Sequence, residues 1–221
     1  MKLAVIVDNY PPNTSSAATQ MSALIKELSS YDINIILIIP DNTIEKSYEI
    51  HDQDNIKIFK YRLKNIRKQS YMLRAIYEVS ISYRIIRLLK KAQIISNLDG
   101  IIWYSPTIFY GPLIKWLKKK YICQSMCILR DIFPQWILDL KIIKKGLVYY
   151  FFKIFENHQY NVADIIAVQS ENNKKYFKTN YPQHTAKLQV IHNWYSEFPQ
   201  RECSINLVKY KSSYDFILLY A

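Results

Sequence analysis

Two patterns of hydrophobic residues alternate along this chain. Short runs rich in apolar residues cover residues 2–7, 33–39, 100–104, 122–129, 163–168 and 188–191. Runs of this length are typical of strands buried on both faces of a parallel sheet. Between them, residues 16–28, 71–92, 109–119, 144–160 and 170–178 predict helices. The clearest are the first two, where apolar side chains recur three or four positions apart.

The first forty residues contain the repeating unit of such a fold. The first strand ends at Asp8, a loop follows, and a helix leads on to the second strand. Ser15 or Ser16 is the predicted N-cap of this helix, because a short hydroxyl side chain can accept a hydrogen bond from a free backbone N–H. A strand–helix–strand unit of this size starts a parallel sheet with a right-handed crossover.

The whole pattern predicts an α/β fold, a Rossmann-like doubly wound parallel sheet. Residues 41–55 are polar and are predicted to form a loop, with a short strand at 56–59. We expect residues 1–195 to form this domain. Residues 196–221 are expected to be a linker followed by the first strand of a second domain, over residues 216–220.

The charge balance points to an anionic partner. The chain has 221 residues, of which 50% are hydrophobic, and a formal net charge of +12 with a pI near 9.4. Basic residues gather in residues 57–91, at Lys115 with Lys118 to Lys120, and at Lys141 with Lys144 and Lys145, beside Trp116, Tyr121, Tyr149, Tyr150, Phe151 and Phe152. Basic residues beside exposed aromatics suit a membrane interface. A solvated helix face remains an alternative, and nucleic acid is a third option supported by charge alone.

Several site types find no support in the sequence. The three cysteines and four histidines do not have the spacing of a metal site, and Cys123 and Cys127 are predicted to be buried thiols. No G-x-G-x-x-G, P-loop or G-x-S-x-G motif is present. No apolar segment approaches the roughly 20 residues that a spanning helix needs, and no signal peptide is recognised.

The first candidate site is the pair Arg130–Asp131. These residues directly follow the apolar run at 122–129, and Pro134 stops any continuation of the strand. In an open α/β sheet the ligand lies in the crevice beyond the carboxyl ends of the strands, so both side chains are candidates for chemistry. The alternative is a structural ion pair at a strand end that only caps a helix.

The second candidate is the loop after the first strand. Residues 10–18 lead into a helix N-terminus through Ser15, Ser16 and Ala17, whose small side chains allow a ligand to approach the backbone. Free N–H groups and the helix dipole at such a terminus attract anions, so these residues predict a phosphate or sugar contact. An ordinary capped helix would look the same in the sequence.

Several segments taken together resemble one family. They are the first strand with the Tyr10-Pro11-Pro12 loop, residues 130–134, the helix–strand join at 155–164, residues 168–172, and Ile191-His192-Asn193-Trp194-Tyr195. In order and spacing they are similar to the amino-terminal half of family-4 retaining glycosyltransferases. The most similar subgroup is the enzymes that build bacterial O-antigen or capsule, such as L-fucosamine transferases.

This resemblance implies a GT-B fold of two Rossmann-like domains, with the chain as the amino-terminal acceptor domain and the carboxyl-terminal donor domain missing from it. Arg130 and Asp131 are then the catalytic candidates, with Arg-Asp where many members have His-Asp. Ser15, Ser16 and Ala17 stand where the family often has glycines near the donor phosphate. The cleft residues of the family map to Ser170 and Asn193.

The implied function is transfer of a sugar, with retention, from a nucleotide sugar, expected to be UDP-linked, to a lipid-linked saccharide. No metal or other cofactor is expected, and this chain alone is expected to be inactive. The expected location is cytoplasmic, peripheral on the inner membrane, with anionic lipids and a separate donor domain as partners and no nucleic acid. The alternative is a non-catalytic peripheral protein that binds anionic lipid.

Overall fold

The computed structural model of the chain describes residues 1–63, 71–105 and 107–195, and for residues 71–75 it describes the backbone alone. The predicted linker and last strand, in residues 196–221, lie outside the described residues. The described elements, in chain order, are β1 (Lys2–Ile6), α1 (Ser16–Ser30), β2 (Asn34–Asp41), β3 (Tyr48–Gln53), β4 (Ile56–Arg62), α2 (Tyr71–Ala92), β5 (Gly100–Ser105), α3 (Gly111–Tyr121), β6 (Gln124–Leu129), α4 (Gln135–Asp139), α5 (Leu147–Val162), β7 (Ile165–Val168), α6 (Glu171–Asn180), a 3-10 helix η1 (Pro182–Lys187) and β8 (Leu188–Val190).

One sheet of eight strands runs through the described chain, in the order β3-β4-β2-β1-β5-β6-β7-β8. Every neighbouring pair is parallel except β3 with β4. From β1 the chain first builds outward through β2 and β4, and then returns to add β5 on the other side. The predicted α/β doubly wound parallel sheet is therefore confirmed, and its order reverses between β1 and β5.

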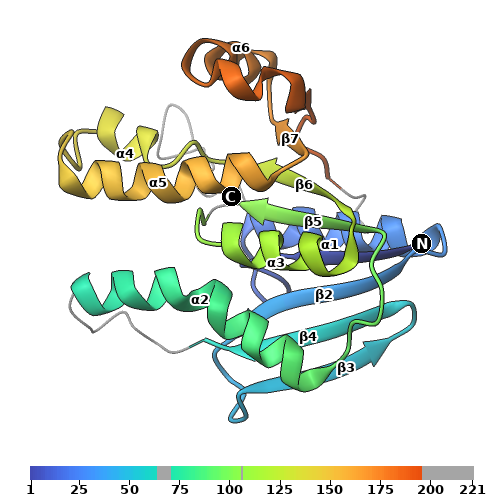
Figure 1. The fold of residues 1–221 in the computed structure, drawn as a ribbon. Helices are drawn as coiled ribbons and strands as arrows, with labels where there is room; N and C mark the ends of the chain where they lie inside the picture. The colour runs from blue at the N-terminus through green and yellow to red at the C-terminus, as the bar shows by residue number, and fades with distance from the viewer. Residues whose placement is uncertain (64–70, 106, 196–221) are drawn as a thin grey trace, which may run out of the picture.

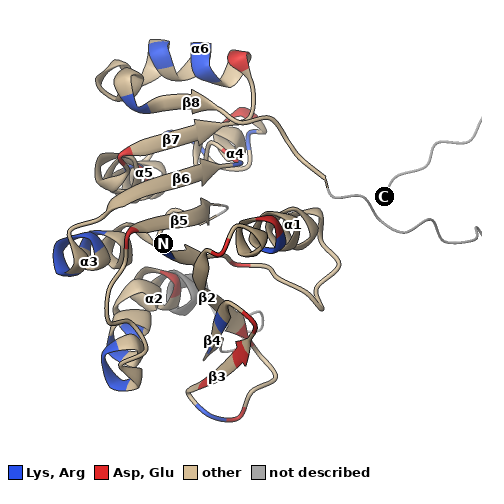
Figure 2. Ribbon diagram, turned by 90° about the vertical axis from the view of Figure 1, so that its right-hand side faces the viewer, with Lys and Arg blue, Asp and Glu red and all other residues tan. Residues whose placement is uncertain are grey.

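Helices cover both faces of this sheet. Figures 1 and 2 show α2, α3 and α5 on one face and α1 on the other. The larger core cluster includes Ile85 of α2, Leu113 of α3 and Tyr160 of α5, all completely buried. The second cluster packs Met21 and Ile25 of α1 against β1, β2 and β5. Right-handed crossovers cause this division, because strands are added in one direction from β1 to β4 and in the opposite direction from β4 to β5 and onward.

Three local predictions were incomplete or wrong. Residues 41–55 were expected to be a loop, but Tyr48–Gln53 forms β3, an antiparallel edge strand. Its polar side chains face solvent, so no apolar pattern marked it. The short helix α4 was not predicted. Ile76 is one of the recurring apolar side chains expected on one face of the helix at residues 71–92, yet it is 59% exposed, because the first turns of α2 extend beyond the sheet (Figure 1).

Candidate functional site

The strand order reverses between β1 and β5, and we call the edge at the carboxyl ends of these strands the crevice. In doubly wound sheets ligands bind where the strand order reverses, because the loops on the two sides turn away from each other there. Asp8 follows β1, and Arg130 follows β6, the neighbour of β5. The helix α1 begins at the same edge. Three of the segments that line the predicted site are thus brought together.

Arg130 is held in a fixed position by neutral partners. Its Nη1 donates to Oε1 of Gln20 at 2.8 Å and to the hydroxyl of Tyr104 at 2.9 Å. Its Nη2 donates to the hydroxyl of Ser16 at 3.3 Å. In the part of the chain that the structure describes, no carboxylate forms an ion pair with this guanidinium. A positive charge is therefore presented, uncompensated, beside the N-terminus of α1.

The three small residues at the start of α1 have different roles. The Ser15 hydroxyl caps the helix, because it accepts a hydrogen bond from the backbone N–H of Ala18 at 3.2 Å. Ser16 is exposed and points its hydroxyl at Arg130. Ala17 is half-buried and packs against the second core cluster. Of the three, Ser16 is the one that the structure joins to Arg130.

Asp131 is separate from Arg130 although the two are adjacent in sequence. Its side chain is exposed, and among the described residues the two form no ion pair. Burial raises the pKa of Tyr104, the hydrogen bond and charge of Arg130 lower it, and the nearby charge of Asp131 raises it further. The first N–H bond of α4 runs from Trp136 to the carbonyl of Ile132, and no side chain caps this helix. Asp131 therefore stands at the crevice without a structural task in the described chain.

The remaining two predicted residues lie in different settings. The Ser170 hydroxyl caps α6 by accepting from the N–H of Asn173 at 3.1 Å. Asn193 is exposed in a segment that crosses α1, where the indole N–H of Trp194 donates to the carbonyl of Gln20 at 2.8 Å. Gln20 thus contacts both Arg130 and the segment of Asn193, whereas Ser170 serves its own helix.

Asp8 is a candidate that the sequence analysis missed. It accepts a short hydrogen bond from the hydroxyl of Tyr110, which lies 3.1 Å from the hydroxyl of Tyr61. Burial raises the pKa of Asp8 to about 6, with the charge of Glu78 adding to the rise and the bond from Tyr110 opposing it. Its place directly after the first strand was the available signal, but it was interpreted only as the end of the apolar run.

Metal binding finds no site in residues 1–63, 71–105 and 107–195. No group of three or more His, Cys, Asp or Glu side chains is placed there so that it could hold an ion. The described cysteines are free, with Cys127 buried as predicted and Cys123 half-buried. The chemistry available at the crevice is therefore a fixed guanidinium, an exposed carboxylate, a half-buried carboxylate and the N–H groups at the start of α1.

This chain is similar to known proteins in its fold, at low sequence identity. The sequence matches no model of a protein family, and it matches no curated protein. The fold is similar to UGT89C1 of Arabidopsis thaliana complexed with UDP-L-rhamnose, with a TM-score of 0.57 and 12% identity over 96% of this chain and 53% of that one. It is also similar to trehalose-6-phosphate from E. coli bound with UDP-2-fluoro glucose, with a TM-score of 0.52 and 14% identity over 80% of this chain and 42% of that one.

A third similar structure is UDP-GlcNAc 2-epimerase from Methanocaldococcus jannaschii, with a TM-score of 0.50 and 15% identity over 87% of this chain and 46% of that one. The chain spans about half the length of the solved structures it matches. At these identities the likeness concerns the fold, and the epimerase illustrates that one fold serves more than one reaction. The chain has the fold of the amino-terminal half of a GT-B protein.

Proposed function

We propose that this chain is the acceptor-binding half of a retaining glycosyltransferase that moves a sugar from a UDP-sugar to a lipid-linked saccharide. The role in bacterial O-antigen or capsule synthesis follows from the sequence resemblance. The observation that carries the proposal is Arg130, a guanidinium without an acidic partner in the described chain. It is fixed beside the N-terminus of α1 at the switch point of a GT-B half.

The geometry suits a reaction in which a diphosphate leaves. The bond between the anomeric carbon and the diphosphate oxygen breaks, and the UDP departs with the electron pair. The acceptor oxygen forms a new bond to that carbon, and its proton passes to the departing diphosphate oxygen on the same face of the sugar. Arg130 and the backbone N–H groups at Ser16 and Ala17 would stabilise the negative charge that develops on the diphosphate. The reaction so written assigns no role to a metal or other cofactor.

Asp131 would act on the acceptor. An exposed carboxylate at this edge can accept a hydrogen bond from the acceptor hydroxyl and orient it toward the anomeric carbon. Because Arg130 forms no ion pair with Asp131, the two residues are free to serve different partners. Asn193 and Ser170 remain predictions, the first as a contact at the cleft and the second with its hydroxyl already used as a cap.

The test is a transfer assay with this chain joined to a donor half. We would supply a panel of UDP-sugars and a polyprenyl-diphosphate-linked saccharide and expect transfer with one of them. Arg130→Gln should lower kcat by on the order of 10²-fold, the scale of a lost charge-stabilising donor. Lys26→Gln, which removes an exposed charge from the same helix, is the matched control and should leave the rate unchanged.

Two results would contradict the proposal. If Lys26→Gln lowered the transfer rate as much as Arg130→Gln, Arg130 would have no specific role beyond its positive charge. No transfer with any donor, from a folded protein that binds anionic vesicles, would instead favour the alternative of a non-catalytic lipid-binding protein.

A further inference from the structure

The first turns of α5 carry an apolar stripe that faces solvent. Leu147, Tyr150, Phe151 and Ile154 stand three or four positions apart and are 91%, 60%, 38% and 67% exposed. On its opposite side the same helix completely buries Glu156 and Gln159. A surface helix of a soluble domain normally shows the reverse distribution, with apolar residues inside and polar residues outside. The stripe therefore needs an explanation outside the core.

Polar contacts fix which side of α5 is inside. Glu156 binds the ammonium group of Lys153 and accepts hydrogen bonds from the hydroxyls of Tyr181 at 2.7 Å and Tyr160 at 3.2 Å. Gln159 accepts a hydrogen bond from Ser105 at 2.8 Å. These buried hydrogen bonds fix which face of α5 points toward the core, so the outward position of the apolar stripe is a stable feature of the fold.

Neighbouring elements add further apolar side chains at the same end of the molecule. Trp136 and Leu140 of the α4 region and Ile142 of the following loop are all exposed. Figure 1 shows α4 beside the first turns of α5, where both extend beyond the carboxyl ends of the strands. We call Trp136, Leu140, Ile142, Leu147, Tyr150 and Ile154 the α4–α5 surface. Single exposed apolar residues are ordinary, but a large group marks an interaction site.

The charges within this surface are basic. Between residues 140 and 155 the only charged side chains are Lys141, Lys144, Lys145 and Lys153. The first three are exposed, and within the described residues they make no ion pair. Asp139, at the end of α4, is the nearest acidic residue before them along the chain, and it accepts a hydrogen bond from Gln135. Three ammonium groups are thus available to an anionic partner.

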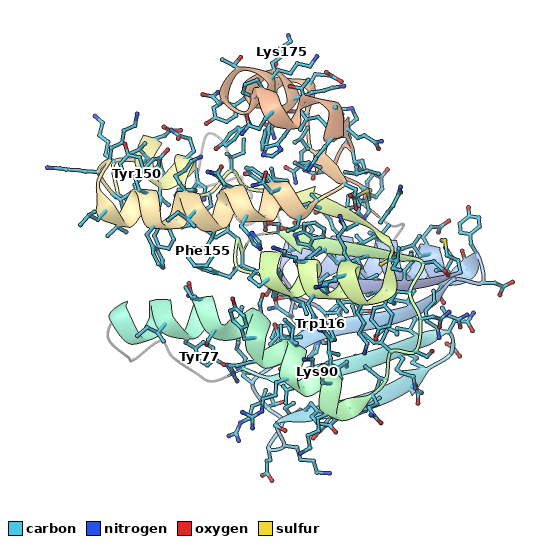
Figure 3. All side chains as sticks on the ribbon, viewed as in Figure 1. Tyr77, Lys90, Trp116, Tyr150, Phe155 and Lys175 are labelled. Atoms are coloured by element: carbon cyan, nitrogen blue, oxygen red, sulfur yellow. The ribbon has the colours of Figure 1, made fainter. Side chains whose placement is uncertain are left out.

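The other basic clusters lack this combination. Lys90 and Lys120 lie at the far ends of α2 and α3 and cover the ring of Trp116 at 5.8 Å and 5.3 Å. Figure 2 shows basic residues on these helix ends and on α6, and Figure 3 shows Lys90 and Trp116 well away from Tyr150. Tyr149, predicted among the exposed aromatics, is buried. In the described chain the α4–α5 surface joins three unpaired lysines to six exposed apolar side chains, whereas Ile122 is the single large apolar side chain exposed beside Lys118 to Lys120.

We propose that the α4–α5 surface docks on an anionic lipid bilayer. The apolar stripe enters the boundary between headgroups and acyl chains, and Lys141, Lys144 and Lys145 meet the lipid phosphates. A second copy of this chain fits less well, because a symmetric contact would bring the lysines of both copies together. Among the helices that the structure describes, none could span a bilayer.

This docking extends the proposed function. Asp131 lies only a few residues before α4, so a docked surface brings the crevice near the plane where a lipid-linked acceptor is met. The two proposals can fail separately. Transfer to a soluble acceptor does not require docking, and docking does not require transfer.

Vesicle flotation with the full chain tests the surface. We would compare vesicles of phosphatidylcholine alone with vesicles of equal parts phosphatidylcholine and phosphatidylglycerol, and we expect binding to the second. Leu147→Gln and Ile154→Gln should each weaken binding roughly tenfold, the scale of one large apolar side chain that no longer leaves water. Ile122→Gln is the matched control, because Ile122 is 93% exposed after α3 and outside the surface.

The charges need a second set of variants. Replacing Lys141, Lys144 and Lys145 with Gln should weaken binding to anionic vesicles about 10²-fold at low salt. The same change at Lys174, Lys175 and Lys178 of α6 removes an equal charge elsewhere and should have a much smaller effect. Far-ultraviolet circular dichroism would confirm that all variants are folded.

Tryptophan quenching locates the contact directly. Brominated acyl chains should quench part of the emission, and Trp136→Phe should abolish this loss, since Trp136 is the tryptophan in the surface. The proposal would be overturned if the surface variants weakened vesicle binding no more than their matched controls. It would also be overturned if Trp136→Phe left the quenching unchanged. So would a dimer, measured by sedimentation, that Leu147→Gln and Ile154→Gln disrupt while vesicle binding persists, because the occupant would then be a second copy.

Discussion

The half-buried carboxylate of Asp8 leads us to expect that its replacement increases the stability of the fold, whereas most substitutions lower it. Replacing Asp8 with Asn should make the protein more stable at neutral pH. Asn has nearly the same shape, and its carbonyl can still accept the hydrogen bond from Tyr110. What the substitution removes is the cost of holding an ionised group among Tyr110, Tyr61 and the nearby charge of Glu78.

The size of the effect follows from the pKa. Folding raises the pKa of Asp8 from 3.8 to about 6, and at about 1.4 kcal/mol for each pH unit this corresponds to about 3 kcal/mol. The folded state binds the extra proton, so its stability falls as the pH rises from about 4 through about 6. Because the side chain keeps some exposure, we expect Asp8→Asn to gain about 2 kcal/mol near pH 7.5, and little below pH 4.

Urea denaturation across a pH series would measure this difference. A gain of about 2 kcal/mol should raise Tm by roughly 4–8 °C in a chain of this size. Asp164→Asn is a control for which we expect the stability to change in the opposite direction. Burial raises the pKa of Asp164, but hydrogen bonds from Lys118 and Ser125 lower it more, so this variant should lose stability at neutral pH and less in acid. An Asp8→Asn variant that is less stable near pH 7.5, or equally changed at every pH, would refute the reasoning.

Three further predictions concern activity and packing. With a donor half attached, Asp131→Asn should lower transfer by on the order of 10²-fold at near-normal Tm; unfolding with proportional loss would show a structural role. The chain alone should transfer no sugar from any UDP-sugar above background. Gly111→Ala should cost about 1–3 kcal/mol in urea denaturation, because the new Cβ would lie 2.5 Å from Cδ2 of His158, while Gly146→Ala, with only a 3.9 Å neighbour, should be tolerated.

The sequence predicted the fold because burial on both faces leaves a strong pattern. The runs that became β1, β2, β5, β6 and β7 are mainly apolar, and apolar residues in the intervening helices recur with a period of about 3.6 residues. The pattern failed where an element faces water. Tyr48–Gln53 is an edge strand, and α4 is shorter than two turns, so neither contains enough buried positions to be recognised.

The surroundings of the candidate residues could be predicted from the sequence only in part. That Arg130 lies at a strand end follows from the local sequence, whereas its link to Ser16 depends on residues 114 positions apart meeting at one edge. Asp8 and Tyr110 are 102 positions apart, so the burial of that carboxylate could not be inferred locally. The outward face of α5 was hidden for the same reason, since partners in distant elements decide which side is inside.

The edge strand β3 also determines how these molecules meet each other. An open sheet edge presents unpaired N–H and C=O groups to which a second chain can add a strand. On β3 the exposed positions include His51 and Asp52, and Asp52 pairs with Lys57 of β4 at 2.5 Å. At the opposite edge β8 has only three residues. Charge at one edge and shortness at the other therefore disfavour strand-by-strand aggregation between copies of this sheet.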